Sequence, residues 1–81
     1  NHVSQLKGMF CLYSEIYTWG PMDRIVYVVN VSSDISPPNI EFMFYDDGKL
    51  TTRSTVLFQH EPIELLPAEE QIIKRLEWGL M

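Results

Sequence analysis

The fold of this chain is decided by the segment IEFMFYDDGKLTTRSTVLF, residues 40–58. Both halves of this segment are rich in aromatic and β-branched residues, which favour strands. The turn-forming residues Asp46–Asp47–Gly48 separate the two halves. The segment therefore predicts a β-hairpin. Because side chains alternate between the faces of a strand, the length of the turn decides which residues meet across this hairpin.

Two turn lengths fit the hairpin, and we predict the longer one. A two-residue turn would place the apolar Phe42 opposite the charged Arg53. A three-residue turn over residues 46–48 instead places Phe42 opposite Thr52 and pairs Glu41 with Arg53. Its glycine would supply the positive φ that closes a bulged hairpin.

With the longer turn, the two faces of the hairpin differ in character. One face carries Ile40, Phe42, Phe44, Leu50, Thr52 and Val56. The other face carries Glu41, Met43, Tyr45 and Arg53. If the first face packs on a helix, the second face stays open, with an apolar centre bordered by charge as in a modest protein interface. We therefore predict that Glu41, Met43, Tyr45 and Arg53 form a protein-binding surface.

Two further strands are predicted before the hairpin. Residues 24–32 have apolar side chains pointing both ways, as in a central strand, and residues 20–23 break the chain before it. Residues 34–39 contain two prolines and predict a loop. Residues 9–19 are rich in aromatic residues and predict a strand. The apolar spacing of three and four over residues 3–17 leaves a helix as the alternative there.

A helix is predicted at the C-terminal end, over residues 67–78. Pro67 suits the first helical turn, and Gly79 is the expected stop. The apolar stripe of this helix consists of Ala68, Ile72, Ile73, Leu76 and Leu80. Such a stripe normally faces the core, so we expect Ile72 and Leu76 to be buried against the sheet.

These elements together predict one small α+β domain over residues 1–81. Its architecture is a four-stranded antiparallel meander with a C-terminal helix packed on one face. If residues 3–17 are helical, the order becomes α-β-β-β-α instead.

The composition argues against several classes of protein. The chain has 11 acidic and 6 basic residues and a net charge of −5, and its basic residues are scattered. We therefore expect no direct nucleic-acid binding. No apolar run is long enough to cross a bilayer, and no signal peptide is evident, so no membrane association is expected. The lone Cys11 excludes an intramolecular disulfide and favours a cytoplasmic location.

The residues that carry chemistry have simpler explanations. Cys11 lies among apolar neighbours, as a small core residue does, and His60 stands beside a turn without the converging ligands that a metal needs. Asp46 and Asp47 suit the hairpin turn, and adjacent carboxylates at a hairpin tip lack the cleft that catalytic carboxylates need. We therefore predict no catalytic, metal-binding or cofactor-binding residue, and no enzymatic activity.

The surplus of Met, Tyr and Trp side chains points to protein binding, because one small core cannot hold them all. We predict a small acidic non-enzymatic interaction module that binds a protein partner, or itself as a homodimer, through the exposed apolar sheet face. An inhibitor, immunity or accessory protein of bacterial or phage type has this character. The alternatives are a dimeric small-ligand-binding domain and, third, a small enzyme.

Overall fold

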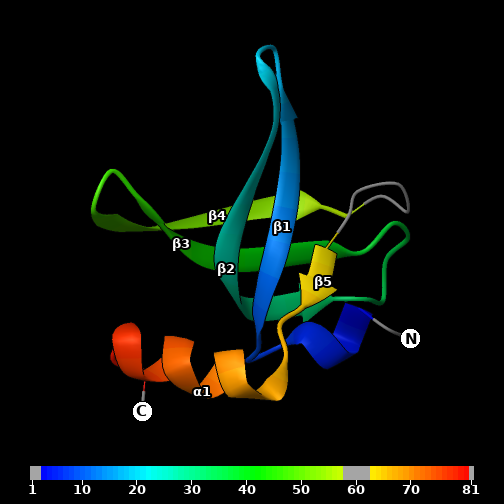
Figure 1. The fold of residues 1–81 in the computed structure, drawn as a ribbon. Coiled ribbons are helices and arrows are strands. Elements are labelled where there is room, and N and C mark those ends of the chain that lie inside the picture. Colours follow the sequence, from blue (N-terminus) through cyan, green and yellow to red (C-terminus); the bar gives the residue numbers. More distant parts are fainter. Residues whose placement is uncertain (1–2, 58–62, 81) are drawn as a thin grey trace.

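The computed structural model describes residues 3–57 and 63–80 (Figure 1). Within these ranges, a short 3-10 helix (Val3–Leu6) precedes a five-stranded antiparallel sheet and one α-helix. The strands are β1 (Phe10–Tyr17), β2 (Gly20–Ser32), β3 (Asn39–Asp46), β4 (Lys49–Val56) and β5 (Ile63–Leu65), and the helix is α1 (Ala68–Glu77). The predicted α+β class, the four-stranded meander and the C-terminal helix are confirmed. The helical alternative for residues 3–17 is wrong, because β1 occupies most of that range.

The strand order is β4-β3-β2-β1-β5, so the last strand returns to the first. After the meander β1 to β4, β5 pairs antiparallel with the free side of β1, placing Leu65 opposite Cys11. The strand pattern along the sequence predicted four strands and did not include this fifth one. Three residues are too few to show an alternating pattern, so the strand left no periodic signal.

The long strand β2 belongs to two ladders in turn. Its first part, residues 20–27, pairs with β1, whereas the part from Tyr27 onward pairs with β3. The register shifts between Val28 and Asn30, so Val29 is the extra residue of a β-bulge, which bends the strand. As a result, the β1–β2 hairpin rises as an arm that runs across β3 and β4 (Figure 1). The predicted strand over residues 24–32 is confirmed, but the predicted break at residues 20–23 is wrong because they begin β2.

The turn of the β3–β4 hairpin has two residues, so the predicted three-residue turn is wrong. Asp47 (φ 52°) and Gly48 (φ 78°) both have positive φ, as a type I′ turn requires. This turn matches the twist of the flanking strands, and it places Phe42 opposite Arg53. Arg53 tolerates that position because its guanidinium lies 5.4 Å from the centre of the Phe42 ring and forms an ion pair with Glu15.

The main core lies where the sheet folds over onto itself. Its buried residues are Cys11, Tyr13, Val26, Val28, Ile40, Phe42, Phe44 and Leu57. The rings of Tyr13 on β1 and Phe42 on β3 lie 5.2 Å apart although β2 stands between their strands. In a flat sheet, strands two positions apart are separated by roughly 9–10 Å, so the sheet is strongly curved here.

The helix packs on the other face of the sheet. Phe10 is fully buried there, with its ring centre 4.9 Å from that of Tyr27 and 5.0 Å from that of Trp78, just after α1. Trp78 also meets Tyr45, at 5.0 Å between ring centres. The prediction that the helix covers the face of Phe42, with Tyr45 pointing away from it, is therefore wrong. The curved sheet buries the Phe42 face by itself, so the helix covers the opposite one.

Candidate functional site

The helix α1 has local sequence signals at both ends. Glu69 and Glu70 stand in its first turn, and Lys74 and Arg75 stand in its last turn, each favourable to the helix dipole. Gly79 (φ 69°) follows the helix, and the amide of the next residue donates to the carbonyl of Arg75 at 2.9 Å. This is the hydrogen bond of a glycine-terminated helix end. The predicted helix over residues 67–78 is thus confirmed to within one residue at each end.

Gln71 attaches the helix to the edge of β1. Its Oε1 accepts a hydrogen bond from the amide of Phe10, and its Nε2 donates to the carbonyl of Phe10, both at 2.7 Å. The Nε2 also donates to the carbonyl of Leu66 at 3.1 Å. The pairing of β5 with β1 begins at Cys11. The amide of Leu66 also donates to the carbonyl of Phe10, at 3.1 Å, so the side-chain amide of Gln71 bridges the amide of Phe10 and the carbonyl of Leu66 at the end of the β1–β5 ladder.

Arg75 and Trp78 complete the contact between the helix and the sheet. Arg75 donates to the carbonyl of Gly8 at 2.9 Å, and its guanidinium lies about 6 Å from the ring centres of Phe10 and Tyr27. Trp78 meets Phe10 edge to face. The side of α1 that faces the sheet is thus built from an amide, a guanidinium and an indole.

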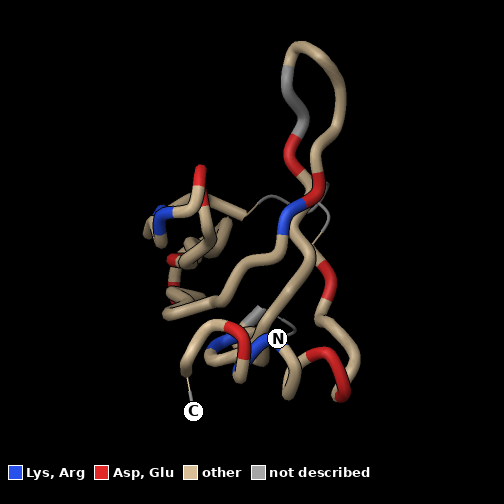
Figure 2. Tube along the Cα trace, turned by 60° about the vertical axis from the view of Figure 1, so that its left-hand side comes forward, with Lys and Arg blue, Asp and Glu red and all other residues tan. Residues whose placement is uncertain are grey.

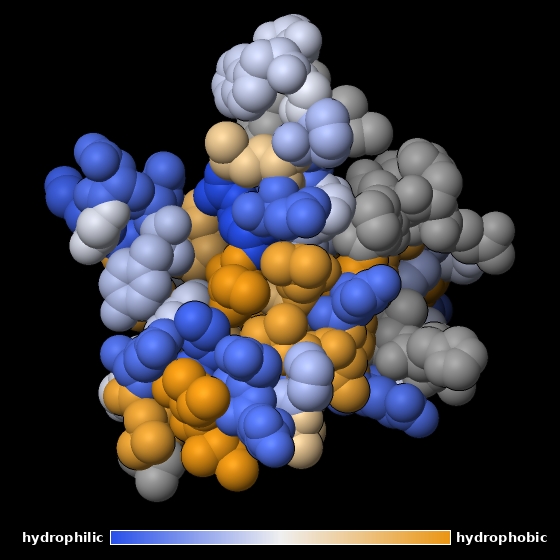
Figure 3. Space-filling view, in the orientation of Figure 1, coloured by the Kyte–Doolittle hydropathy of each residue, from blue (hydrophilic) through white to orange (hydrophobic). Residues whose placement is uncertain are grey.

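The aliphatic side chains of α1 point to solvent instead. Ile72 is 61% exposed, Leu76 60% and Ile73 45%, and none of the ten helix residues is fully buried. The expectation that Ile72 and Leu76 are buried is therefore wrong. The reason is that Gln71 and Arg75 find backbone carbonyls at the sheet edge, which turns the opposite side of the helix outward. Figure 3 shows the resulting apolar patch over α1, bordered by hydrophilic residues.

This outward face has an acidic border. Glu69, Glu70 and Glu77 are all exposed, and they stand near the two ends of α1 with the two basic residues between them (Figure 2). The ammonium of Lys74 lies 3.0 Å from the carboxylate of Glu77, and its side chain is three-quarters buried. We use the name outward face for Glu69, Glu70, Ile72, Ile73, Leu76 and Glu77.

The four residues of the predicted protein-binding surface on the sheet do not all lie on one face. Glu41, Met43 and Tyr45 share one face of β3, with Tyr45 48% exposed and in contact with Trp78. Arg53 lies on the opposite face, because the two-residue turn shifts its register by one. The predicted pair of Glu41 with Arg53 is therefore wrong.

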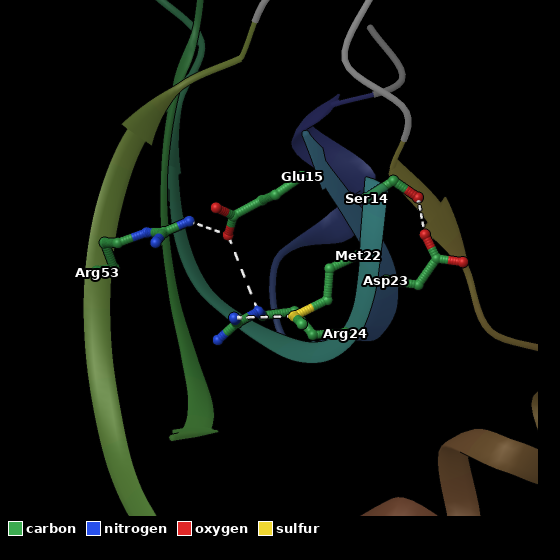
Figure 4. A network of polar contacts seen from close by, with 6 residues as sticks. All are labelled: Ser14, Glu15, Met22, Asp23, Arg24 and Arg53. Atoms are coloured by element: carbon green, nitrogen blue, oxygen red, sulfur yellow. Dashed lines mark hydrogen bonds and ion pairs between the residues drawn. The ribbon is translucent and has the colours of Figure 1, made fainter. Parts of the chain in front are cut away.

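Arg53 instead belongs to a polar network at the root of the arm (Figure 4). The carboxylate of Glu15 on β1 accepts from the guanidinium of Arg53 on β4 and lies 3.9 Å from Nε of Arg24 on β2. Arg24 in turn lies over the ring of Phe44, at 4.6 Å. One carboxylate between two guanidinium groups is a structural charge cluster, and it links the arm to β4.

Of the residues considered for catalysis or metal binding, the structure describes Cys11, Asp46 and Asp47. Burial raises the pKa of the Cys11 thiol to about 11, so this side chain stays protonated and unreactive near neutral pH. In the part of the chain that the structure describes, no three His, Cys, Asp or Glu residues converge as metal ligands. His60 lies outside the described residues. Asp46 and Asp47 are exposed at the hairpin turn.

Sequence reasoning found the apolar residues of α1 but assigned them to the wrong side. The signal that could have corrected this assignment is the polar stripe of Gln71 and Arg75, whose long side chains can reach backbone groups at a sheet edge. Among the described helices, none is both long and apolar enough to cross a bilayer. Comparison of the chain with protein-family models, curated proteins and solved structures gave no match.

Proposed function

We propose that this chain is a small acidic protein-interaction module without enzymatic activity, and that it binds its partner through the outward face of α1. The observation that carries this proposal is the exposure of Ile72, Ile73 and Leu76 on one side of one helix. Scattered single apolar residues are normal on protein surfaces, whereas a contiguous patch rimmed by polar residues is typical of an interaction site.

The way α1 is attached to the sheet supports the same proposal. An amphipathic helix normally turns its apolar stripe to the core. Here the inner side is held by the hydrogen bonds of Gln71 and Arg75 and by the ring contacts of Trp78. The helix is therefore fixed in an orientation that presents the apolar stripe, and a partner that covers the stripe would gain its burial free energy.

The biological role and the location belong to this proposal as well. An inhibitor, an immunity protein or an accessory protein acts by occupying a partner's surface, which requires a binding face and no catalytic group. The buried, protonated thiol of Cys11 suits the reducing cytoplasm.

A second contact surface is proposed on the sheet, where the chain would meet a second copy of itself or extend the contact with its partner. Tyr45 and Leu50 lie opposite each other across the β3–β4 hairpin, and each is 48% exposed. Glu41 and Met43 lie on the same face as Tyr45. Two large apolar side chains are exposed on this surface, Tyr45 and Leu50, compared with three on the outward face of α1.

Site-specific crosslinking tests the proposal. A photo-crosslinking amino acid at position 72 should capture a defined partner in cells of the source organism, and the same group at position 35 should not. Ile35 is a suitable control because it is also aliphatic and 54% exposed, but it lies in the loop between β2 and β3.

Two matched variants complete the test. Leu76→Glu should abolish recovery of the captured partner, and Ile35→Glu, which adds the same charge, should preserve it. A partner that is recovered equally well with Leu76→Glu would rule out the outward face as the binding surface.

A further inference from the structure

We propose that the occupant of the outward face is a basic amphipathic helix of a partner protein. This inference rests on the proposed function and adds the chemistry of the partner. Two features of α1 support it, which are the distribution of charge around its apolar side chains and the spacing of those side chains along the helix.

The charges on the outward face are nearly all negative. Glu69, Glu70 and Glu77 are exposed, and the charge of Glu77 is shared with Lys74, so Glu69 and Glu70 supply most of the negative charge of this face. Arg75 donates to the carbonyl of Gly8 beneath the helix, and Lys74 is paired with Glu77 and only 25% exposed. A partner with basic residues around an apolar stripe would be attracted to this face and aligned on it.

The same charges argue against other occupants. In a two-fold antiparallel pair of α1 helices, Glu69 and Glu70 of one copy would approach Glu77 of the other copy. In a parallel pair, each carboxylate would approach its own equivalent. Either arrangement places like charges together at the edge of a desolvated contact. Nucleic acid and anionic membrane surfaces would be repelled for the same reason.

The spacing on α1 indicates the form of the partner. Ile72, Ile73 and Leu76 recur at steps of three and four residues, which is the pattern that a second helix packs against. Glu69 and Glu77 are eight residues apart, or about 12 Å along the helix at 1.5 Å per residue. A matching helix therefore carries Lys or Arg residues about two turns apart on either side of its apolar positions.

Two designed peptides test this chemistry directly. Each would have about 18 residues, enough for a helix to form on binding, and the same leucine pattern. The polar positions would be all Lys in one peptide and all Glu in the other. The Lys peptide should bind the wild-type protein at least about tenfold more tightly than the Glu peptide, measured by fluorescence anisotropy. Its affinity should fall as the salt concentration rises.

Three variants separate the proposed site from a general attraction to an acidic protein. Ile72→Glu adds a negative charge and removes an apolar contact, so it should weaken binding of the Lys peptide at least about tenfold. Ile35→Glu adds the same charge elsewhere and should leave binding unchanged or slightly stronger. The double variant Glu69→Lys/Glu70→Lys should bind the Glu peptide better than the Lys peptide.

Several outcomes would overturn the inference without touching the proposed function. One is equal affinity of the wild-type protein for both peptides. Another is that Ile72→Glu does not weaken binding of the Lys peptide. The third is that the wild-type protein sediments as a dimer and that Leu76→Glu dissociates this dimer. If the proposed function is wrong, the result is different, because Leu76→Glu would then leave the capture of the partner in cells unchanged. A captured partner that depends on Leu76 but contacts the face with an acidic segment would reject the basic helix alone.

Discussion

Gly48 shows how one residue sets the register of the whole β3–β4 hairpin. Both turn residues, Asp47 and Gly48, adopt positive φ, and a type I′ turn of this kind allows a two-residue connection between twisted strands. The presence of the turn was predictable from its Asp-Gly sequence. Its length was not, because the prediction treated Arg53 as a residue that must avoid Phe42. Stacking over the ring and pairing with Glu15 removed that penalty.

The conformation of Gly48 leads to the first prediction. Gly48→Val should lower the free energy of unfolding by about 1–2 kcal/mol, because a β-branched residue is strained at positive φ. A Cβ at this position would have no heavy atom within 4 Å, so the loss should come from the backbone alone. Gly48→Asn, whose side chain tolerates this region, should lose less. Urea denaturation measures both, and equal losses would contradict the backbone explanation.

At the scale of the element, α1 illustrates what periodicity can and cannot predict. The bounds of the helix followed from Pro67, Gly79 and the apolar spacing. The direction in which the stripe faces depends on contacts far away in the sequence, since Gln71 binds Phe10. Hydrophobic patterning gives the relative positions of side chains around a helix. Tertiary contacts, here the hydrogen bonds of Gln71 and Arg75 and the ring contacts of Trp78, determine which side meets the sheet.

The two sides of α1 should differ sharply in their contribution to stability. Gln71→Ala removes three hydrogen bonds and leaves the amide of the buried Phe10 without its acceptor, so it should cost about 1–3 kcal/mol. Leu76→Ala, on the exposed side, should cost less than about 1 kcal/mol.

Thermal or urea unfolding of the two variants checks this order. Gln71→Glu is a useful third variant, because its carboxylate can accept from the Phe10 amide but cannot donate to the two carbonyls. A larger loss for Leu76→Ala than for Gln71→Ala would mean that α1 faces the sheet with its apolar stripe.

At the scale of the molecule, the fold consists of the β1–β2 and β3–β4 hairpins, and the bent strand β2 connects them by pairing with both β1 and β3. The sequence pattern predicted both hairpins and their order, because each strand of the meander is long enough to show a composition typical of strands. It could not anticipate the bulge at Val29, the curvature that buries Phe42, or the return of β5 to β1. These features arise from contacts between distant segments. They explain why the helix covers the face of the sheet opposite to the one predicted.

The polar network at the root of the arm should govern how firmly the two hairpins hold together. Glu15→Gln removes the negative charge shared by Arg24 and Arg53, and should loosen the arm. Amide hydrogen exchange over residues 14–23 should then become roughly tenfold faster, as expected for the loss of a charge-assisted hydrogen bond. Exchange in β3 should change little.

Glu41→Gln is the matched control for this experiment, since Glu41 lies on β3 outside the network. It should leave exchange in the arm unchanged. Equal acceleration by Glu41→Gln, or acceleration spread evenly over the sheet in Glu15→Gln, would show that the network does not act locally on the arm.

The change of ladder within β2 makes the arm a natural place to graft foreign sequence. In the described part of the chain, residues 14–17 pair with residues 20–23 and with no other strand. Adding two residues to each side would preserve the alternation of side chains and lengthen the arm by about 7 Å. The tip could thus carry a peptide epitope or a fluorophore without disturbing either the curved core or the helix that we propose as the binding face.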